Sequence, residues 1–323
     1  MNLKKILPIV GIIILVFILF NLDFKEIIRI FSGINPLYSF LCFFAVVPLL
    51  LMANIEWQLL LKKQKIHVSF WYSIKNFFFG YFFGFITPGG FGALARSVYL
   101  SVESKTPLPK CVSNIIIYNT VEFIAMFLVG AVGAIYLSSI YPSLFYIIIL
   151  VMLLVIALFL FFFKSKISKV LFTKIVQSKV FATLKDRIDG SIDTFYEDLP
   201  KFKDVLLPLS ISLTGWFLKC VMLFFISQLF LIDIFFVDFI MIMAVADVIA
   251  SIPISIYGIG TREAALIPLF YAFNPAITTE QIVSLSLFWF VIIWLTPSII
   301  GAFLTLHETK KLGKFKLDQK TSK

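Results

Sequence analysis

Residues 69–104 form an apolar stretch, SFWYSIKNFFFGYFFGFITPGGFGALARSVYLSVES, that Pro and Gly interrupt near its middle. Proline removes a backbone donor from a helix, and glycines allow a sharp turn. The part after the break, residues 91–103, would be only about 20 Å long as a helix. That is too short to cross the roughly 30 Å apolar core of a bilayer. We therefore expect a helical hairpin that enters a membrane, turns and leaves on the same side.

A second interrupted stretch, residues 238–274, repeats this pattern with the break PISIYGIGTRE at Pro253–Glu263. Both breaks contain proline, then Gly-x-Gly, then an arginine: Arg96 in the first and Arg262 in the second. Flanking charges predict that the first hairpin enters from the cytoplasm and the second from outside. Paired broken helices of opposite orientation are a recurring transporter device, with the substrate site between them.

The composition places the whole chain in a membrane. Of its 323 residues, 60% are hydrophobic and only 14% are charged, whereas soluble domains are about 25% charged. The net charge is +10, and the lysines and arginines that produce it lie in loops beside apolar runs. This position indicates topology signals and contacts with anionic lipid rather than with nucleic acid. We expect an all-α, polytopic bundle with six full spans and two re-entrant hairpins in an inverted-repeat-like arrangement.

Six uninterrupted apolar runs are long enough to span a bilayer. They are about 6–22, 37–60, 111–138, 142–163, 204–230 and 281–306. Lysines and arginines cluster before the first run, after the second, in 164–203 and in the tail. Because positive residues stay in the cytoplasm, both termini are predicted to lie inside, in a multi-pass protein of the cell membrane.

The long hydrophilic segment 164–203 divides the chain. Its apolar residues recur every three or four positions, which is typical of an amphipathic helix. We expect one transmembrane domain, 1–306, whose halves 1–163 and 204–306 are joined by this cytoplasmic linker. The basic tail 307–323 is predicted to be disordered.

The two breaks supply the candidate substrate site. Free backbone N–H groups at the start of a broken helix attract anions, and arginine adds a planar fork suited to phosphate. The alternative is that Pro and Gly only allow tight helix packing. The proposed substrate-binding residues are Arg96, Arg262, Glu263, Gly89, Gly90, Gly92, Gly258, Gly260, Glu122 and Asp247.

Charged residues within apolar runs are costly and usually face a cavity or a partner. Glu122 and Asp247 could neutralise the arginines, carry a proton or form structural ion pairs. Glu56 and Lys219 lie nearer the ends of their runs, where side chains can extend to the interface. Trp57, Trp71 and Trp216 also lie near predicted segment ends, as interfacial anchors do.

The sequence contains no motif for a cofactor, a metal or a nucleotide. Its three cysteines are far apart and it has only two histidines, so no spacing suits a metal site. No Walker loop or catalytic triad occurs. We expect no catalytic residues, no metal and no cofactor.

The two break motifs and the hydropathy profile over about 5–306 resemble the flippase-like membrane family that includes the transmembrane region of bacterial lysylphosphatidylglycerol synthase. Gly258-x-Gly260-Thr261-Arg262-Glu263 carries the resemblance best. The first motif departs from it, because Ala93 stands where an acidic residue commonly follows the last glycine. The resemblance implies lipid movement between leaflets. In the synthase a separate soluble domain transfers lysine from tRNA, and this chain is expected to have no such activity.

The function predicted from the sequence is a flippase or scramblase for an anionic phospholipid or a polyprenyl-phosphate lipid. Two alternatives stay open: a membrane transferase that acts on a lipid, and a scaffold for a lipid-modifying enzyme. The expected partners are a lipid with an anionic headgroup and either a second copy of the chain or such an enzyme.

Overall fold

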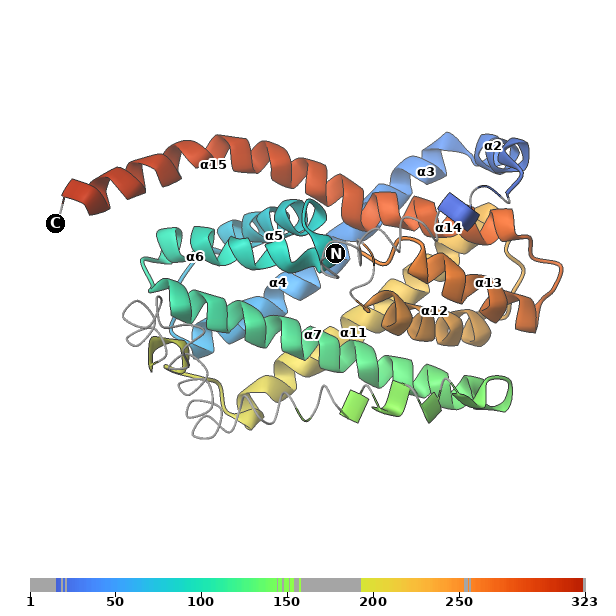
Figure 1. Ribbon diagram of the computed structural model, residues 1–323, viewed down its shortest axis with the longest axis horizontal. Helices are drawn as coiled ribbons and strands as arrows, with labels where there is room; N and C mark the ends of the chain where they lie inside the picture. The colour runs from blue at the N-terminus through green and yellow to red at the C-terminus, as the bar shows by residue number, and fades with distance from the viewer. Residues whose placement is uncertain are drawn as a thin grey trace, which may run out of the picture.

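The computed structural model describes residues 16–157 and 193–321, with gaps at 19, 21, 144, 147, 151, 154–156, 253, 254 and 256. The described residues form helices and no strand (Figure 1), so the predicted all-α class is confirmed. The main helices are α2 (Phe24–Gly33), α3 (Pro36–Cys42), α4 (Val46–Lys63), α5 (Phe70–Phe85), η2 (Pro88–Ala95), α6 (Arg96–Ser104), α7 (Leu108–Tyr136), α11 (Phe202–Ser227), α12 (Phe236–Ala250), α13 (Thr261–Phe273), α14 (Thr279–Phe290), η6 (Val291–Leu295) and α15 (Thr296–Thr321).

Among the described residues, 4 helices are long and apolar enough to cross a membrane. They are Pro36–Lys63, Leu108–Ser139, Phe202–Phe230 and Thr279–Glu308. Each contains one of the spans predicted from the sequence. The other two predicted spans, 6–22 and 142–163, and the linker up to residue 192 lie largely outside the described part of the chain.

Large apolar side chains cover the outside of these helices. Phe40 of α3, Phe225 of α11 and Phe303 of α15 are 60%, 66% and 70% exposed, respectively. In water such a surface would be strongly unfavourable, because each exposed phenylalanine forgoes about 2 kcal/mol of burial. The outer surface is therefore suited to lipid, as expected for an integral membrane protein.

Each interrupted stretch folds as a helical hairpin. In the first hairpin, residues 70–104, the chain runs along α5 and returns through η2 and α6, which pack against α5. In the second hairpin, residues 236–273, α13 returns along α12. Figure 1 shows the first hairpin at one end of the bundle and the second at the other, with both tips toward the middle.

The first turn depends on close backbone approach. Thr87 is extended, and its hydroxyl accepts a hydrogen bond from the Gly92 N–H at 2.7 Å. A Cβ atom on Gly92 would lie 2.1 Å from the Phe83 carbonyl oxygen, so only glycine fits there.

The second turn depends on backbone conformation. Tyr257, Gly258 and Gly260 all have positive φ values, +49°, +81° and +84°. Side chains other than glycine rarely adopt this region. The Gly-x-Gly pattern thus forms the part of the turn that leads directly into α13.

Basic residues from separate loops meet at one end of the bundle. Lys65 and Lys110 each pair with Asp198 at 2.8 Å. Hydrogen bonds from Lys110 and then from Lys65 hold the pKa of Asp198 below its usual value. The two cationic loops predicted to share the cytoplasm are therefore next to each other in the fold.

The tail differs from its prediction, because α15 continues as a helix to Thr321. The last span runs through α14, the π-helical turn η6 and the first half of α15, and the tail continues α15. A helix that is already nucleated extends at little cost through lysine and leucine, which are good helix formers. The prediction of a disordered tail was wrong for residues 307–321.

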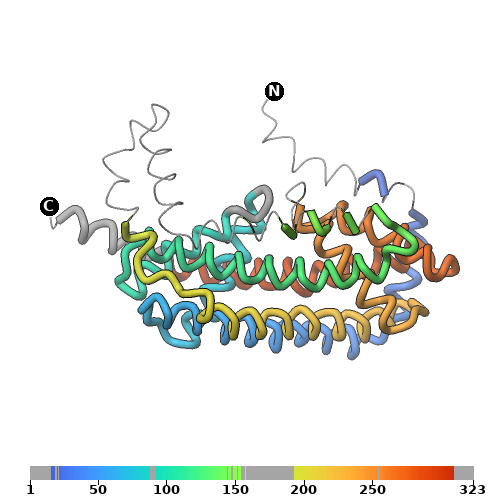
Figure 2. The backbone as a smooth tube through the Cα atoms, turned by 90° about the horizontal axis from the view of Figure 1, so that it is seen from below, coloured from blue at the N-terminus to red at the C-terminus, as the bar shows by residue number. Residues whose placement is uncertain are grey.

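Two apolar cores hold the bundle together. One lies among α7, α11, α12, α13 and α14, and the other among α4, α5, α6 and the start of α7. Figure 2 shows α4 and α11 side by side along one edge of the molecule, where they pack on each other. The space between the two cores is where the hairpin tips meet.

Candidate functional site

A cavity of about 430 Å³ lies between the two cores. Both hairpins and the long helices α4, α7 and α11 contribute to its wall. Its polar lining is Glu56, Arg96, Tyr118, Asn119, Glu122, Ser212, Lys219, Asp247, Ser251, Ser255, Tyr257 and Arg262. The two arginines selected from the sequence therefore face one shared cavity, although 166 positions separate them in the chain.

Arg96 enters the cavity through an aromatic cage. Its guanidinium carbon lies 4.5, 4.6 and 5.1 Å from the ring centres of Trp57, Phe77 and Tyr118. Such contacts stabilise a cation by about 0.5–2 kcal/mol each. Gly80 makes room for the side chain, because a Cβ atom there would lie 3.0 Å from the Arg96 Cδ.

The rings hold the Arg96 charge but satisfy none of its hydrogen-bond donors. Arg96 is 4% exposed, and its Nε and Nη2 have no acceptor among the described residues. A buried donor without an acceptor costs about 1–3 kcal/mol. The arrangement is positioned for a ligand that brings its own acceptor oxygens.

Arg262 lies at the start of α13 and is 5% exposed. Its Nη2 donates to the Tyr257 carbonyl oxygen at 3.2 Å, while its Nε has no acceptor within the described chain. The Arg262 guanidinium is thus fixed by the turn that precedes it, and its Nε–H donor stays available to a ligand.

Lys219 of α11 and Asp247 of α12 form an ion pair at 2.6 Å. The Lys219 ammonium also lies 3.6 Å from the ring centre of Trp216. Because both charges are compensated within the wall, this pair joins two helices and adds little net charge to the cavity.

Two carboxyl groups complete the wall. Glu122 accepts hydrogen bonds from Trp216 Nε1 at 3.1 Å and from the Tyr118 hydroxyl at 3.4 Å. Glu56 is fully buried, and neither of its carboxyl oxygens has a hydrogen-bond partner among the described residues. The position of Glu56 corrects the expectation that it extends to the interface: it lies at the cavity because α4 presents it to α7.

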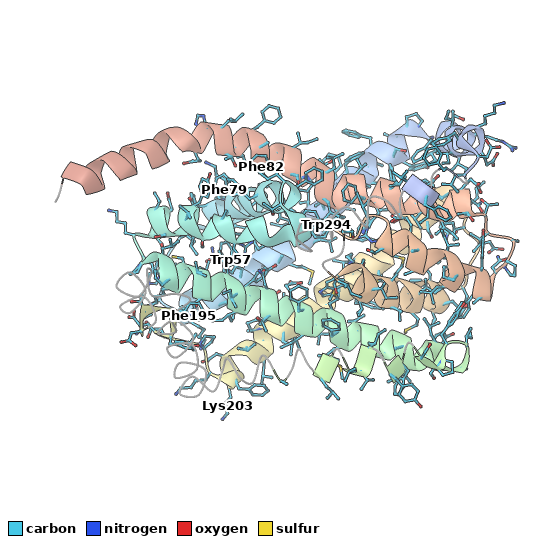
Figure 3. The ribbon with its side chains drawn as sticks, in the orientation of Figure 1. Trp57, Phe79, Phe82, Phe195, Lys203 and Trp294 are labelled. Atoms are coloured by element: carbon cyan, nitrogen blue, oxygen red, sulfur yellow. The ribbon has the colours of Figure 1, made fainter. Side chains whose placement is uncertain are left out.

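The tips of the two hairpins touch beside the cavity. The Tyr257 hydroxyl donates to the Tyr81 carbonyl oxygen at 3.5 Å, and its ring stacks on Trp294 at 4.0 Å. Trp294 belongs to the π-helical turn η6, a distortion that is frequent at functional sites. In Figure 3, Trp294 lies close to the middle of the molecule and Trp57 projects between α6 and α7.

The remaining predicted site residues belong to the two turns and to the start of α13. Gly258 lines the cavity, whereas Gly92 and Gly260 are not among its lining residues; Gly89 and Gly90 belong to η2, like Gly92. Glu263 is 1% exposed, and its carboxylate accepts from the Gly260 N–H at 2.6 Å and from the Ser286 hydroxyl. One of the N–H groups expected to be free for an anion there is therefore bonded to Glu263.

The comparison with known families agrees with this architecture. The family model described as the lysylphosphatidylglycerol synthase TM region matches residues 6–301. The chain belongs to this family. A search of curated proteins finds no matching sequence. Membership of this family and the helices long enough to cross a membrane both support a multi-pass membrane protein.

For this member of the lysylphosphatidylglycerol synthase TM family, sequence reasoning missed the residues that surround the arginines. Trp57 is fully buried against Arg96 and Trp216 lines the cavity, so neither is the expected interfacial anchor; Trp71, at 76% exposure, still suits that role. Lys219 also lies in the wall instead of at an interface. A signal was present, because Glu56 and Trp57 place a carboxyl group and an indole N–H side by side within an apolar run.

Proposed function

We propose that the chain moves a lipid with an anionic headgroup between the two leaflets of a membrane. The observation that carries this proposal is that Arg96 and Arg262, from two separate hairpins, line one cavity with buried N–H donors to spare. Phosphate oxygens accept such donors in a planar fork. The apolar part of the lining, which includes Leu49 and Ile211, suits the start of an acyl or polyprenyl chain.

The two hairpins supply a route from each side. In the proposal, each is re-entrant and reaches membrane depth from its own end of the bundle. The end with Lys65 and Lys110 faces the cytoplasm by the positive-inside rule, and both termini lie there. Irregular backbone is tolerated at such depth only where it is buried in protein or lines a cavity, as the two turns do.

The test measures leaflet exchange of a fluorescent phosphatidylglycerol in proteoliposomes. The wild type should exchange the lipid faster than protein-free vesicles. The double variant Arg96→Ala/Arg262→Ala should fall to the protein-free rate, because both donors to the headgroup are lost. Arg29→Ala is the matched control, since Arg29 is exposed on α2, far in the chain from either break. Equal exchange by wild type, double variant and empty vesicles would reject the proposal.

Among the described residues, the carboxylate that adjoins Arg262 does not favour the alternative of a transferase. The carboxylate closest to Arg262 in sequence is Glu263, and both of its oxygens are engaged by Gly260 and Ser286. A general base needs an oxygen within reach of the substrate. The scaffold alternative depends on the linker 164–203, most of which lies outside the described residues.

A further inference from the structure

Glu56 has no part in holding a headgroup, yet it lies in the cavity wall. Its side chain is 0% exposed, and neither carboxyl oxygen receives a hydrogen bond from an N–H or O–H donor of the described residues. The carboxyl group of Glu122 on α7 lines the same cavity. A fully buried carboxyl group that receives no hydrogen bond ionises only at a high cost.

Glu122 has surroundings that Glu56 lacks. It accepts hydrogen bonds from Trp216 Nε1 and from the Tyr118 hydroxyl. Glu56 has no comparable donor in the described chain. The wall does not stabilise its charged form, so a proton binds to Glu56 more readily than to an exposed carboxyl group.

Charged and titratable groups from every neighbouring element line the cavity with Glu56. They are Tyr81 of α5, Arg96 of α6, Tyr118 and Glu122 of α7, Lys219 of α11, Asp247 of α12, Tyr257 of the second turn and Arg262 of α13. Lys219 and Asp247 compensate each other at 2.6 Å. Ionisation of Glu56 would therefore add a negative charge that competes with an anionic headgroup for the two arginines.

We propose that Glu56 is a proton-binding site whose proton is taken up together with the anionic headgroup. The proposal rests on the proposed function. The proton comes from water, adds to a Glu56 oxygen when the headgroup binds, and returns to water when the headgroup leaves. Since linkage is reciprocal, the proton favours the headgroup as much as the headgroup favours the proton.

The coupling is tested by the pH dependence of leaflet exchange, with equal pH on both sides of vesicles that contain fluorescent phosphatidylglycerol. Wild-type exchange should slow by at least about fivefold as the pH is raised, a typical size for coupled sites. Glu56→Gln mimics the protonated acid and should flatten the profile. Glu103→Gln, at an exposed carboxyl near the end of α6, should keep the wild-type slope.

A second measurement reads the proton itself. The infrared spectrum of the wild type in vesicles that contain phosphatidylglycerol, at neutral pH, should contain a carbonyl band of a protonated carboxyl group. Glu56→Gln should lose this band, whereas Glu122→Gln should keep it. Persistence of the band in Glu56→Gln, or its absence from the wild type, overturns the proton site.

The two proposals fail in different ways. A flat wild-type profile, or equal slopes for wild type and Glu56→Gln, overturns the coupling and leaves lipid movement standing. A wild type no faster than empty vesicles defeats the proposed function, and the infrared band then decides the proton site alone. Loss of the band in Glu56→Gln would support that site, and its persistence would overturn it.

Discussion

Replacement of Asp247 by asparagine should destabilise the fold by leaving Lys219 buried without its counter-ion. Lys219 Nζ lies 2.6 Å from Asp247 Oδ2, and the two side chains are 17% and 6% exposed. The asparagine side chain would keep the shape of the aspartate but not its charge. The perturbation therefore isolates the ion pair that joins α11 to α12.

The expected cost follows from the surroundings of the lysine. Removal of one partner from a buried ion pair costs about 3–5 kcal/mol. Lys219 keeps its contact with the Trp216 ring at 3.6 Å, which retains about 0.5–2 kcal/mol of stabilisation. We therefore predict that Asp247→Asn lowers the free energy of unfolding by about 2–4 kcal/mol.

Reversible unfolding in mixed micelles measures this difference, with Glu26→Gln as the control. Glu26 pairs with Arg29 at the surface, where the side chains are 39% and 81% exposed, so its loss should cost less than about 0.5 kcal/mol. The double variant Lys219→Met/Asp247→Leu should recover most of the stability, because an apolar pair of similar volume replaces a buried ion pair at little cost. The reasoning is refuted if Asp247→Asn costs no more than the surface control, or if the double variant is less stable than the single one.

Two further predictions concern the hairpin tips and the basic end. Gly84→Ala should lower the free energy of unfolding by about 1–3 kcal/mol through overpacking, because the new Cβ would lie 1.9 Å from the Tyr257 hydroxyl. Gly33→Ala is the control and should be neutral in the same unfolding assay, because the space around Gly33 is open. Equal effects of the two substitutions would contradict the contact between the hairpin tips. The hydrogen bond from Lys110 lowers the pKa of Asp198 in the folded protein. The ionised Asp198 therefore stabilises the fold above the ordinary aspartate pKa of about 3.9, and this stabilisation is lost as the pH falls through the lowered pKa. Asp198→Asn should remove this acid-dependent part of the unfolding free energy, and identical pH curves for variant and wild type would exclude it.

The hairpins were predictable because their signals are local. Proline and closely spaced glycines together disfavour an unbroken helix from the local sequence alone, and the short apolar remainders could not span a bilayer. The four long spans were predictable for the same reason, since length and apolar composition suffice.

The cavity wall was not predictable, because it depends on which helices pack together. The sequence places Glu56 and Lys219 toward the ends of apolar runs, and only the packing of α4 and α11 against α7 turns them inward. The cage around Arg96 likewise comes from three separate helices. Glu263 was expected to bind substrate, but it is not among the residues that line the cavity. Its carboxylate caps α13 by accepting a hydrogen bond from the Gly260 N–H. Such a local hydrogen bond competes with any ligand for the same carboxylate.

The central claim is that two hairpins from opposite ends bring two guanidinium groups to one headgroup site. The most direct test is a density map of the wild type in nanodiscs of phosphatidylglycerol. The account predicts headgroup density in the cavity, in contact with both Arg96 and Arg262, and its loss in Arg96→Ala/Arg262→Ala. Lipid density confined to the outer surface, or residues 69–104 and 238–274 seen as unbroken spanning helices, would contradict it.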